Sequence, residues 1–202
     1  MRGAFIILFL ALGFLSSCDQ NTFDSEKKLI TFLKDADNGF FKEKAINGID
    51  ISIMYRPIDL LVQQELGSSA NNKQIDSIRN IYSNYIYFGL NLTKDGQELL
   101  STIPQNNNEF GAMVNQLSFG MDKVIHLYSS RKDTVEMTDY VYPRMYGYSK
   151  TTSMLLVYPR DKKITSAENF IISIEDIGLK TGDVKFKFDT NILNEEPRLS
   201  FD

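Results

Sequence analysis

The stretch that decides the fold is TTSMLLVY, residues 151–158. It is largely apolar and short, and we expect it to form a central strand of a β-sheet. Every pattern downstream of Phe119 also favours strands, since apolar residues alternate with polar ones. Four such segments are Val124–Ser129, Thr134–Tyr142, Phe170–Ile174 and Val184–Phe188. Lys185 and Lys187 alternate with the apolar residues of the last segment, which suits an exposed sheet edge.

The first half of the chain mixes strands with helices. Period-two alternation predicts strands at Ile49–Tyr55 and Ile86–Leu92, and Asn47-Gly48 is a strong hairpin signal. Helical spacing appears at Pro57–Leu66, Gln74–Asn84 and Phe110–Leu117, whereas Ser25–Lys34 fits either a helix or a strand. We therefore expect a mainly β fold, a β-sandwich of immunoglobulin-like form or an α+β arrangement, with two or three short helices in the first half.

Composition narrows the classes of function. The 202 residues carry a net charge of −4, which disfavours partners such as nucleic acid that need a basic surface. One cysteine allows no disulfide within the chain and no cysteine-based metal site. We predict no cofactor.

The N-terminus has the pattern of an exported protein. Arg2 precedes an unbroken apolar run from Ala4 to Leu15. Twelve residues in a helix reach only about 18 Å, too short to cross a bilayer but typical of a secretory signal peptide. The run ends in Leu15-Ser16-Ser17-Cys18, and Cys18 is the single cysteine of the chain.

These four residues resemble the lipobox of bacterial lipoproteins. The resemblance implies cleavage before Cys18, a diacylglyceryl group on its thiol and usually an acyl chain such as palmitate on the new amine. It predicts a signal peptide at residues 1–17, the lipidated Cys18 with a short tether at 18–24, and one globular β-rich domain at 25–202.

The lipobox resemblance also predicts a location. We expect a membrane anchored through the lipid on Cys18 in a bacterial cell envelope, at the outer membrane, on its periplasmic side or at the cell surface. Asp19 keeps the inner membrane as an alternative location, because an Asp directly after the cysteine retains some enterobacterial lipoproteins there.

No arrangement of residues predicts catalysis or metal binding. His126 is the only histidine, and no nucleophile elbow, HExxH motif or glycine-rich phosphate loop accompanies it. We interpret His126 as a structural residue on a sheet face. The alternative, that it acts as general base for a serine distant in sequence, stays open. Acidic residues at 133, 136, 139, 175–176 and 195–196 are interpreted as solvated carboxylates.

The segment DYVYPRMYGYSK, residues 139–150, is the candidate binding surface. If its backbone is extended, one side presents a row of aromatic and guanidinium groups: Tyr140, Tyr142, Arg144, Tyr146 and Tyr148. Tyr and Arg are favoured at protein-binding hot spots, and the same face suits stacking on sugar rings. The alternative is that these tyrosines only cover the sheet as cross-strand pairs.

Two hypotheses for function follow. The first is a lipid-anchored envelope protein that acts as a non-catalytic binding or accessory subunit, with a protein partner in the envelope. The second is a hydrolase or carbohydrate-binding module acting on envelope or extracellular polymers. The absent catalytic motifs favour the first.

Overall fold

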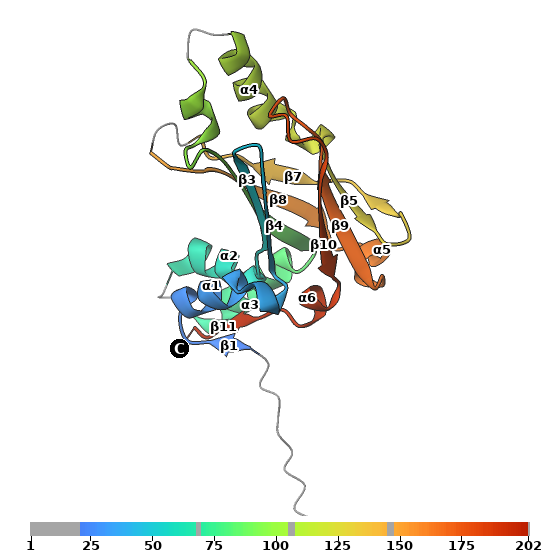
Figure 1. The fold of residues 1–202 in the computed structure, drawn as a ribbon. Helices are drawn as coiled ribbons and strands as arrows, with labels where there is room; N and C mark the ends of the chain where they lie inside the picture. The colour runs from blue at the N-terminus through green and yellow to red at the C-terminus, as the bar shows by residue number, and fades with distance from the viewer. Residues whose placement is uncertain (1–20, 68–69, 105–107, 145–147, 202) are drawn as a thin grey trace, which may run out of the picture.

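Two antiparallel sheets face each other in the computed structural model, which describes residues 21–67, 70–104, 108–144 and 148–201 (Figure 1). The first sheet has the order β2 (Phe41–Ile46), β3 (Ile49–Tyr55), β4 (Tyr85–Lys94), β8 (Thr152–Pro159) and β7 (Asp139–Val141). The second has the order β10 (Val184–Asp189), β9 (Asn169–Ile174), β5 (Ile125–Ser129) and β6 (Thr134–Val135). A small parallel pair, β1 (Thr22–Phe23) with β11 (Arg198–Leu199), completes the β-structure of the described residues. The chain is therefore mainly β, as predicted.

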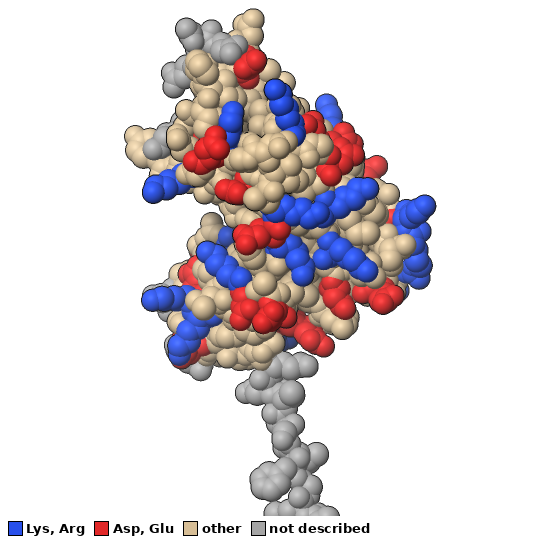
Figure 2. Space-filling model, in the orientation of Figure 1, with Lys and Arg blue, Asp and Glu red and all other residues tan. Residues whose placement is uncertain are grey.

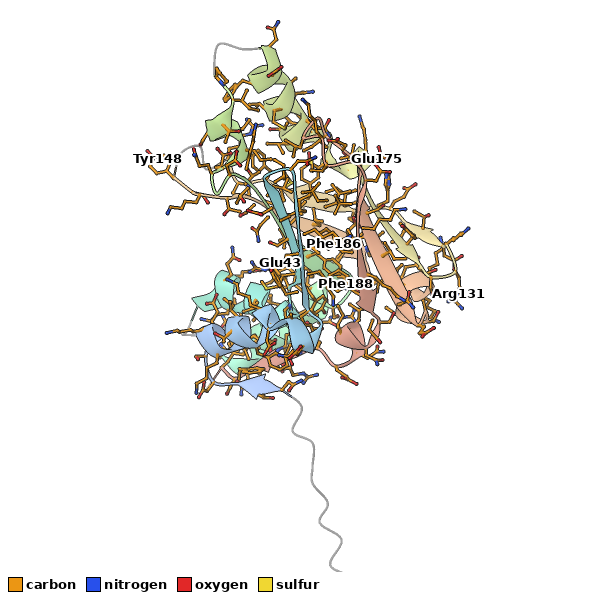
Figure 3. All side chains as sticks on the ribbon, in the orientation of Figure 1. Glu43, Arg131, Tyr148, Glu175, Phe186 and Phe188 are labelled. Carbon is orange, nitrogen blue, oxygen red and sulfur yellow. The ribbon has the colours of Figure 1, made fainter. Side chains whose placement is uncertain are left out.

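The alternation of apolar and polar residues forms the core between the sheets. Along β8, every second residue is buried, and β10 follows the same rule. Phe88 of β4 meets Phe170 and Phe188 of the opposite sheet, with ring centroids 5.9 and 5.6 Å apart. Figure 3 shows Phe186 and Phe188 directed toward the first sheet. The predicted strand at 151–158 is an interior strand, between β4 and β7.

The hairpin between β2 and β3 confirms the Asn47-Gly48 signal. Both residues have a positive φ, 52° and 77°, as a two-residue turn of this kind requires. A similar turn at Asp95-Gly96 follows β4. The turn at Asn47-Gly48 sets the register of β2 with β3, in which Lys44 lies opposite Ile51.

The helices gather at the two ends of the sheets. Three of them, α1 (Glu26–Lys34), α2 (Ile58–Leu66) and α3 (Asn72–Tyr82), lie beside the β1–β11 pair, and α4 (Asn108–Phe119) lies at the other end (Figure 1). Asn71 and Gln74 form a reciprocal capping box at the start of α3. Two four-residue helices, α5 (Lys162–Thr165) and α6 (Asn191–Asn194), follow in the second half. None of the described helices has the length and apolar character needed to cross a membrane.

Some predictions need correction. The expected strand Thr134–Tyr142 divides into β6 and β7, which belong to different sheets because the chain crosses from one to the other after Val135. The short helices expected in the first half are α1, α2 and α3, so Ser25–Lys34, which fitted either a helix or a strand, contains a helix; three further helices of the described residues follow in the second half. Thr22–Phe23, taken as part of the tether, pairs with β11. The lysines of β10 do lie on a sheet edge.

We expect Phe88→Ala to lower the free energy of unfolding by about 3–5 kcal/mol, because it leaves a cavity where the sheets meet. Urea denaturation measures this. Lys187→Ala, on the exposed side of β10, is the control and should change stability by less than about 0.5 kcal/mol. Equal effects of the two changes would contradict the assigned core.

Candidate functional site

The outer face of the five-stranded sheet is open between the two helical ends. Its inward residues, such as Leu90, are buried, so the residues between them point outward. The register places them in rows across neighbouring strands. One row is Met54, Gly89, Leu155 and Val141, and the next is Ser52, Asn91 and Ser153. Figure 2 shows the molecule hollowed at this height, above the helical end.

A groove of about 590 Å³ occupies the polar part of this face. Its floor carries hydroxyl, amide and carboxylate groups from three strands. Ser153 Oγ donates to Asn91 Oδ1 at 2.7 Å, and Thr93 Oγ1 donates to Asp50 Oδ2 at 3.1 Å. Figure 3 shows Glu43 and Tyr148 at the edges of the open side. The arrangement suits recognition of a polar ligand, since these groups both donate and accept hydrogen bonds.

The residues of the candidate binding surface differ in their burial and do not lie on one face. Extended backbone continues only to Val141, so the segment does not present one flat row. Tyr140 and Tyr142 are half-buried and pack against the core, whereas Arg144 and Tyr148 are exposed. Tyr146 lies outside the described residues.

An exposed apolar group nevertheless surrounds this segment. Four large hydrophobic side chains of the described residues are exposed: Ile81 at 54%, Phe119 at 66%, Val141 at 51% and Tyr148 at 91%. Val141 and Tyr148 belong to the segment. The guanidinium of Arg144 lies over the ring of Phe119, with Cζ 5.6 Å from the ring centroid. We call Phe119, Val141, Arg144 and Tyr148 the corner surface.

Sequence reasoning missed Phe119 and Val141. Phe119 follows the apolar stripe of α4, in which Met113 and Leu117 are buried, but does not belong to it. An apolar residue off the buried stripe at a helix end was the available signal. Val141 is an aliphatic residue on the opposite side of β7 from Tyr140, so it does not belong to the predicted row of tyrosines.

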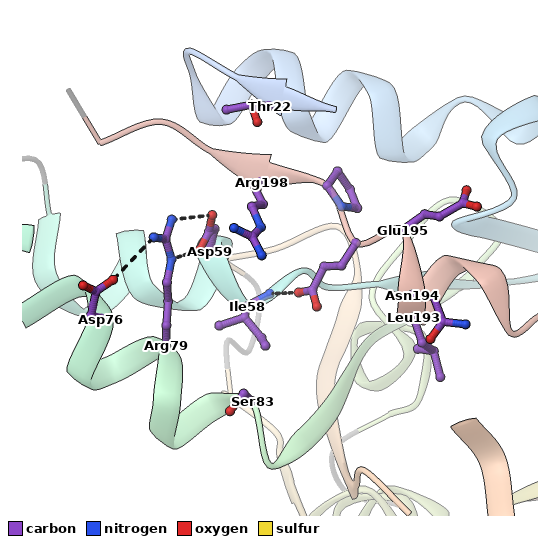
Figure 4. A pocket seen from close by; sticks show the side chains of 12 residues that line it. Thr22, Ile58, Asp59, Asp76, Arg79, Ser83, Leu193, Asn194, Glu195 and Arg198 are labelled. Carbon is purple, nitrogen blue, oxygen red and sulfur yellow. Dashed lines mark hydrogen bonds and ion pairs between the residues drawn. The ribbon is translucent and has the colours of Figure 1, made fainter. Parts of the chain in front are cut away.

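A second, strongly charged pocket of about 670 Å³ lies at the helical end (Figure 4). Asp59 is buried there and binds Arg79 with both carboxylate oxygens, at 2.7 and 2.9 Å. The amide of Leu199 also donates to Asp59, at 2.8 Å. One carboxylate thus joins α2, α3 and β11, and its hydrogen bonds are occupied by the scaffold.

Glu196 is a second carboxylate of this pocket in which both oxygens accept hydrogen bonds. It accepts a hydrogen bond from the Ile58 amide at the start of α2 and another from Arg160 at 3.3 Å. Burial raises the pKa of Glu196 above its ordinary value near 4.5, although these two donors favour the charged form. A raised pKa in a pocket is the property of a general acid. Here both oxygens serve partners that hold the fold, which favours a structural role.

His126 lies on β5 and pairs with Glu175, whose Oε1 is 2.7 Å from Nε2. Its cross-strand neighbour is Ser173, but no hydrogen bond joins the two side chains. Both side chains are exposed on the outward face of the four-stranded sheet, and Glu175 is labelled in Figure 3. Within the described segments, no group of three His, Cys, Asp or Glu residues is arranged to hold a metal ion.

We expect Glu196→Gln to change how stability depends on pH. Because the folded state raises the pKa of Glu196, the folded protein binds more protons than the unfolded chain just above pH 4.5, so stability falls as the pH rises through that window. The variant lacks this loss, and its stability relative to the wild type should increase between about pH 4 and 7. Urea denaturation across this range measures the difference. Glu195→Gln, at the exposed neighbour, is the matched control for the loss of one carboxylate. A gap between wild type and Glu196→Gln that stays constant across this pH range would contradict the assignment.

Comparisons with known proteins were made with this geometry in view. No protein-family model matches the chain, and no curated protein sequence matches it. The fold is similar, with a TM-score of 0.40 and 10% identity, to a solved structure described as a novel protein of unknown function from Burkholderia pseudomallei. The match covers 82% of this chain and 84% of the other.

Proposed function

We propose that the chain is a lipid-anchored protein of a bacterial cell envelope whose domain is a non-catalytic binding or accessory subunit at the membrane surface. The lipobox-like residues 15–18 support the anchor, and the outer membrane is the proposed location. Strand β1 begins at Thr22, so only three residues separate Cys18 from the folded part. At most about 3.6 Å per residue, this tether keeps the domain close to the lipid.

The observation that carries the binding role is the corner surface. Isolated apolar side chains are ordinary on a protein surface, but two of the four exposed large ones belong to residues 139–148 and a third, Phe119, contacts Arg144 of that segment. Arg144 lies over the Phe119 ring, which keeps this guanidinium positioned while its remaining donors face solvent. Aromatic and arginine side chains are those that most often anchor protein partners. We therefore propose a protein partner in the envelope.

The hydrolase alternative gains less support. The two buried carboxylates of the charged pocket, Asp59 and Glu196, are both engaged by groups that hold α2 and β11 in place. His126 pairs with an acid and not with a hydroxyl. The carbohydrate-binding alternative keeps one specific observation, the polar groove on the outer sheet face.

The anchor is tested by Cys18→Ser. Without the thiol no diacylglyceryl group can be attached, so the variant should accumulate as uncleaved precursor or in the soluble fraction. Metabolic labelling with palmitate followed by membrane fractionation measures both effects. Ser17→Thr or another small change that keeps Cys18 is the control and should remain labelled. A Cys18→Ser protein that is still labelled and membrane-bound would rule out the proposed anchor.

The binding role is tested by Phe119→Ala and Tyr148→Ala. Each side chain is exposed, so stability should change by less than about 0.5 kcal/mol, whereas loss of a hot-spot contact costs about 2 kcal/mol of binding, roughly thirtyfold in affinity. Crosslinking in the native envelope should yield a product that both variants lose. Ile81→Ala, equally exposed but on α3, is the matched control and should retain it. If all three variants behave alike, the corner surface is not the docking site.

A further inference from the structure

Arg56 lies on the outer face of the sheet without a partner for its charge. Its backbone amide donates to the Tyr87 carbonyl at 2.9 Å, which continues the ladder beyond β3. Its side chain crosses Gly89, and Cδ lies 3.6 Å from the place a Cβ would occupy there. The arginine side chain thus passes over Gly89, at ordinary van der Waals distance from that position.

The guanidinium of Arg56 is incompletely satisfied within the described part of the chain. Its Nε is buried and has no hydrogen-bond partner, and no described carboxylate lies within ion-pair distance. Burial lowers the pKa of Arg56, and the charge of Glu26 only partly opposes this. Because arginine keeps its proton in proteins, the group stays cationic and its desolvation is only partly compensated. An anionic group of a ligand would supply the missing partner.

The groove described above begins one row away from Gly89. Asn91 and Ser153 form its floor next to that row, and Ser52 extends it toward the β2 edge. At the other side, a smaller cavity of about 200 Å³ shares Ser153 with the groove and is walled by Tyr142 and Pro143. The groove and the smaller cavity together offer hydroxyl and amide groups and an aromatic wall, and Arg56 lies just beyond the groove, over Gly89 in the neighbouring row.

We propose that this outer-face groove binds an acidic saccharide, with a sugar carboxylate on Arg56, hydroxyls on Asn91, Ser52 and Ser153, and a ring against Tyr142. The site goes beyond the protein docking proposed for the corner surface and does not depend on it. Hydroxyls and amides match the alternating donors and acceptors of a sugar, and aromatic faces pack on sugar rings.

The charges of the groove select this class over other anions. Two acids, Glu43 and Asp50, and one cation, Lys44, line its far part, and the chain as a whole carries −4. A densely charged polymer such as a nucleic acid would be repelled there. A saccharide of low charge density, with a carboxylate on every second ring, can place one carboxylate on Arg56 while its neutral groups lie beside both acids.

The test is calorimetric titration of the full-length chain in detergent with a hexasaccharide of alternating glucuronate and N-acetylglucosamine. We expect binding that is at least about tenfold weaker in Arg56→Gln, the loss of one charge-assisted contact, and partly restored in Arg56→Lys. Asn91→Ala should also weaken binding. A neutral N-acetylglucosamine hexasaccharide should bind less tightly than the acidic one. Arg144→Gln, on the corner surface, should leave the affinity unchanged, which separates this site from the protein-docking proposal.

Three outcomes would overturn the proposal. The first is absence of binding to the acidic hexasaccharide by a wild-type protein that melts cooperatively. The second is equal binding by wild type and Arg56→Gln. The third is Arg56-dependent binding of an oligoglutamate peptide without saccharide binding, which would assign the groove to an acidic peptide. Glu26→Gln tests whether Arg56 only stabilises the fold through its interaction with Glu26. In that case Arg56→Gln and Glu26→Gln should lower stability equally, and neither should alter the affinity for the saccharide.

Discussion

The packing of Phe88 against Phe170 and Phe188 is the contact on which the rest of the structure depends. Phe88 lies on β4, the central strand of its sheet, and its contacts with β9 and β10 join the two sheets. Since side chains alternate along a strand, fixing Phe88 inward places Tyr87 and Gly89 outward. The open space at Gly89 that Arg56 crosses is therefore a consequence of the core. A change of register by one residue would remove both together.

Asp59 supplies a second constraint, which ties the end of the chain to its first half. Its contacts with Arg79 and the Leu199 amide join segments separated by 20 and 140 residues. Arg79 also lies over the ring of Phe201. A buried carboxylate would be costly without these donors, and together they satisfy it. We infer that this charged pocket is used to close the fold, which leaves the outer face of the sheet for the proposed recognition.

The sequence was informative where one local pattern decides the outcome. Strands β3, β4 and β10 followed from alternation, because each has one buried face, and β8 followed from its short, largely apolar sequence. The turn at Asn47-Gly48 followed from two residues that tolerate a positive φ. The crossing between β6 and β7 could not be predicted, since extended backbone continues on both sides of it and only tertiary pairing separates the two strands.

The candidate sites depended more on long-range contacts. Tyr140 and Tyr142 were recognised as part of an unusual segment, but their half-burial reflects contacts made by elements distant in sequence, such as the Met121 amide, which donates to the Tyr140 hydroxyl. The relation between Arg56 and Gly89 arises from the pairing of β3 with β4, and nothing in either segment alone indicates it.

The proposed anchor and the proposed recognition surfaces would act at different ends of the domain. The three residues between Cys18 and Thr22 span at most about 11 Å, so an anchored chain would hold the β1–β11 end against the bilayer. Helix α4, which ends at Phe119, lies at the opposite end (Figure 1). The corner surface would then extend away from the lipid, and the groove would open sideways between the two ends. A short tether thus fixes the distance of the domain from the membrane, and it does so without covering the surface on which a partner or a saccharide would bind.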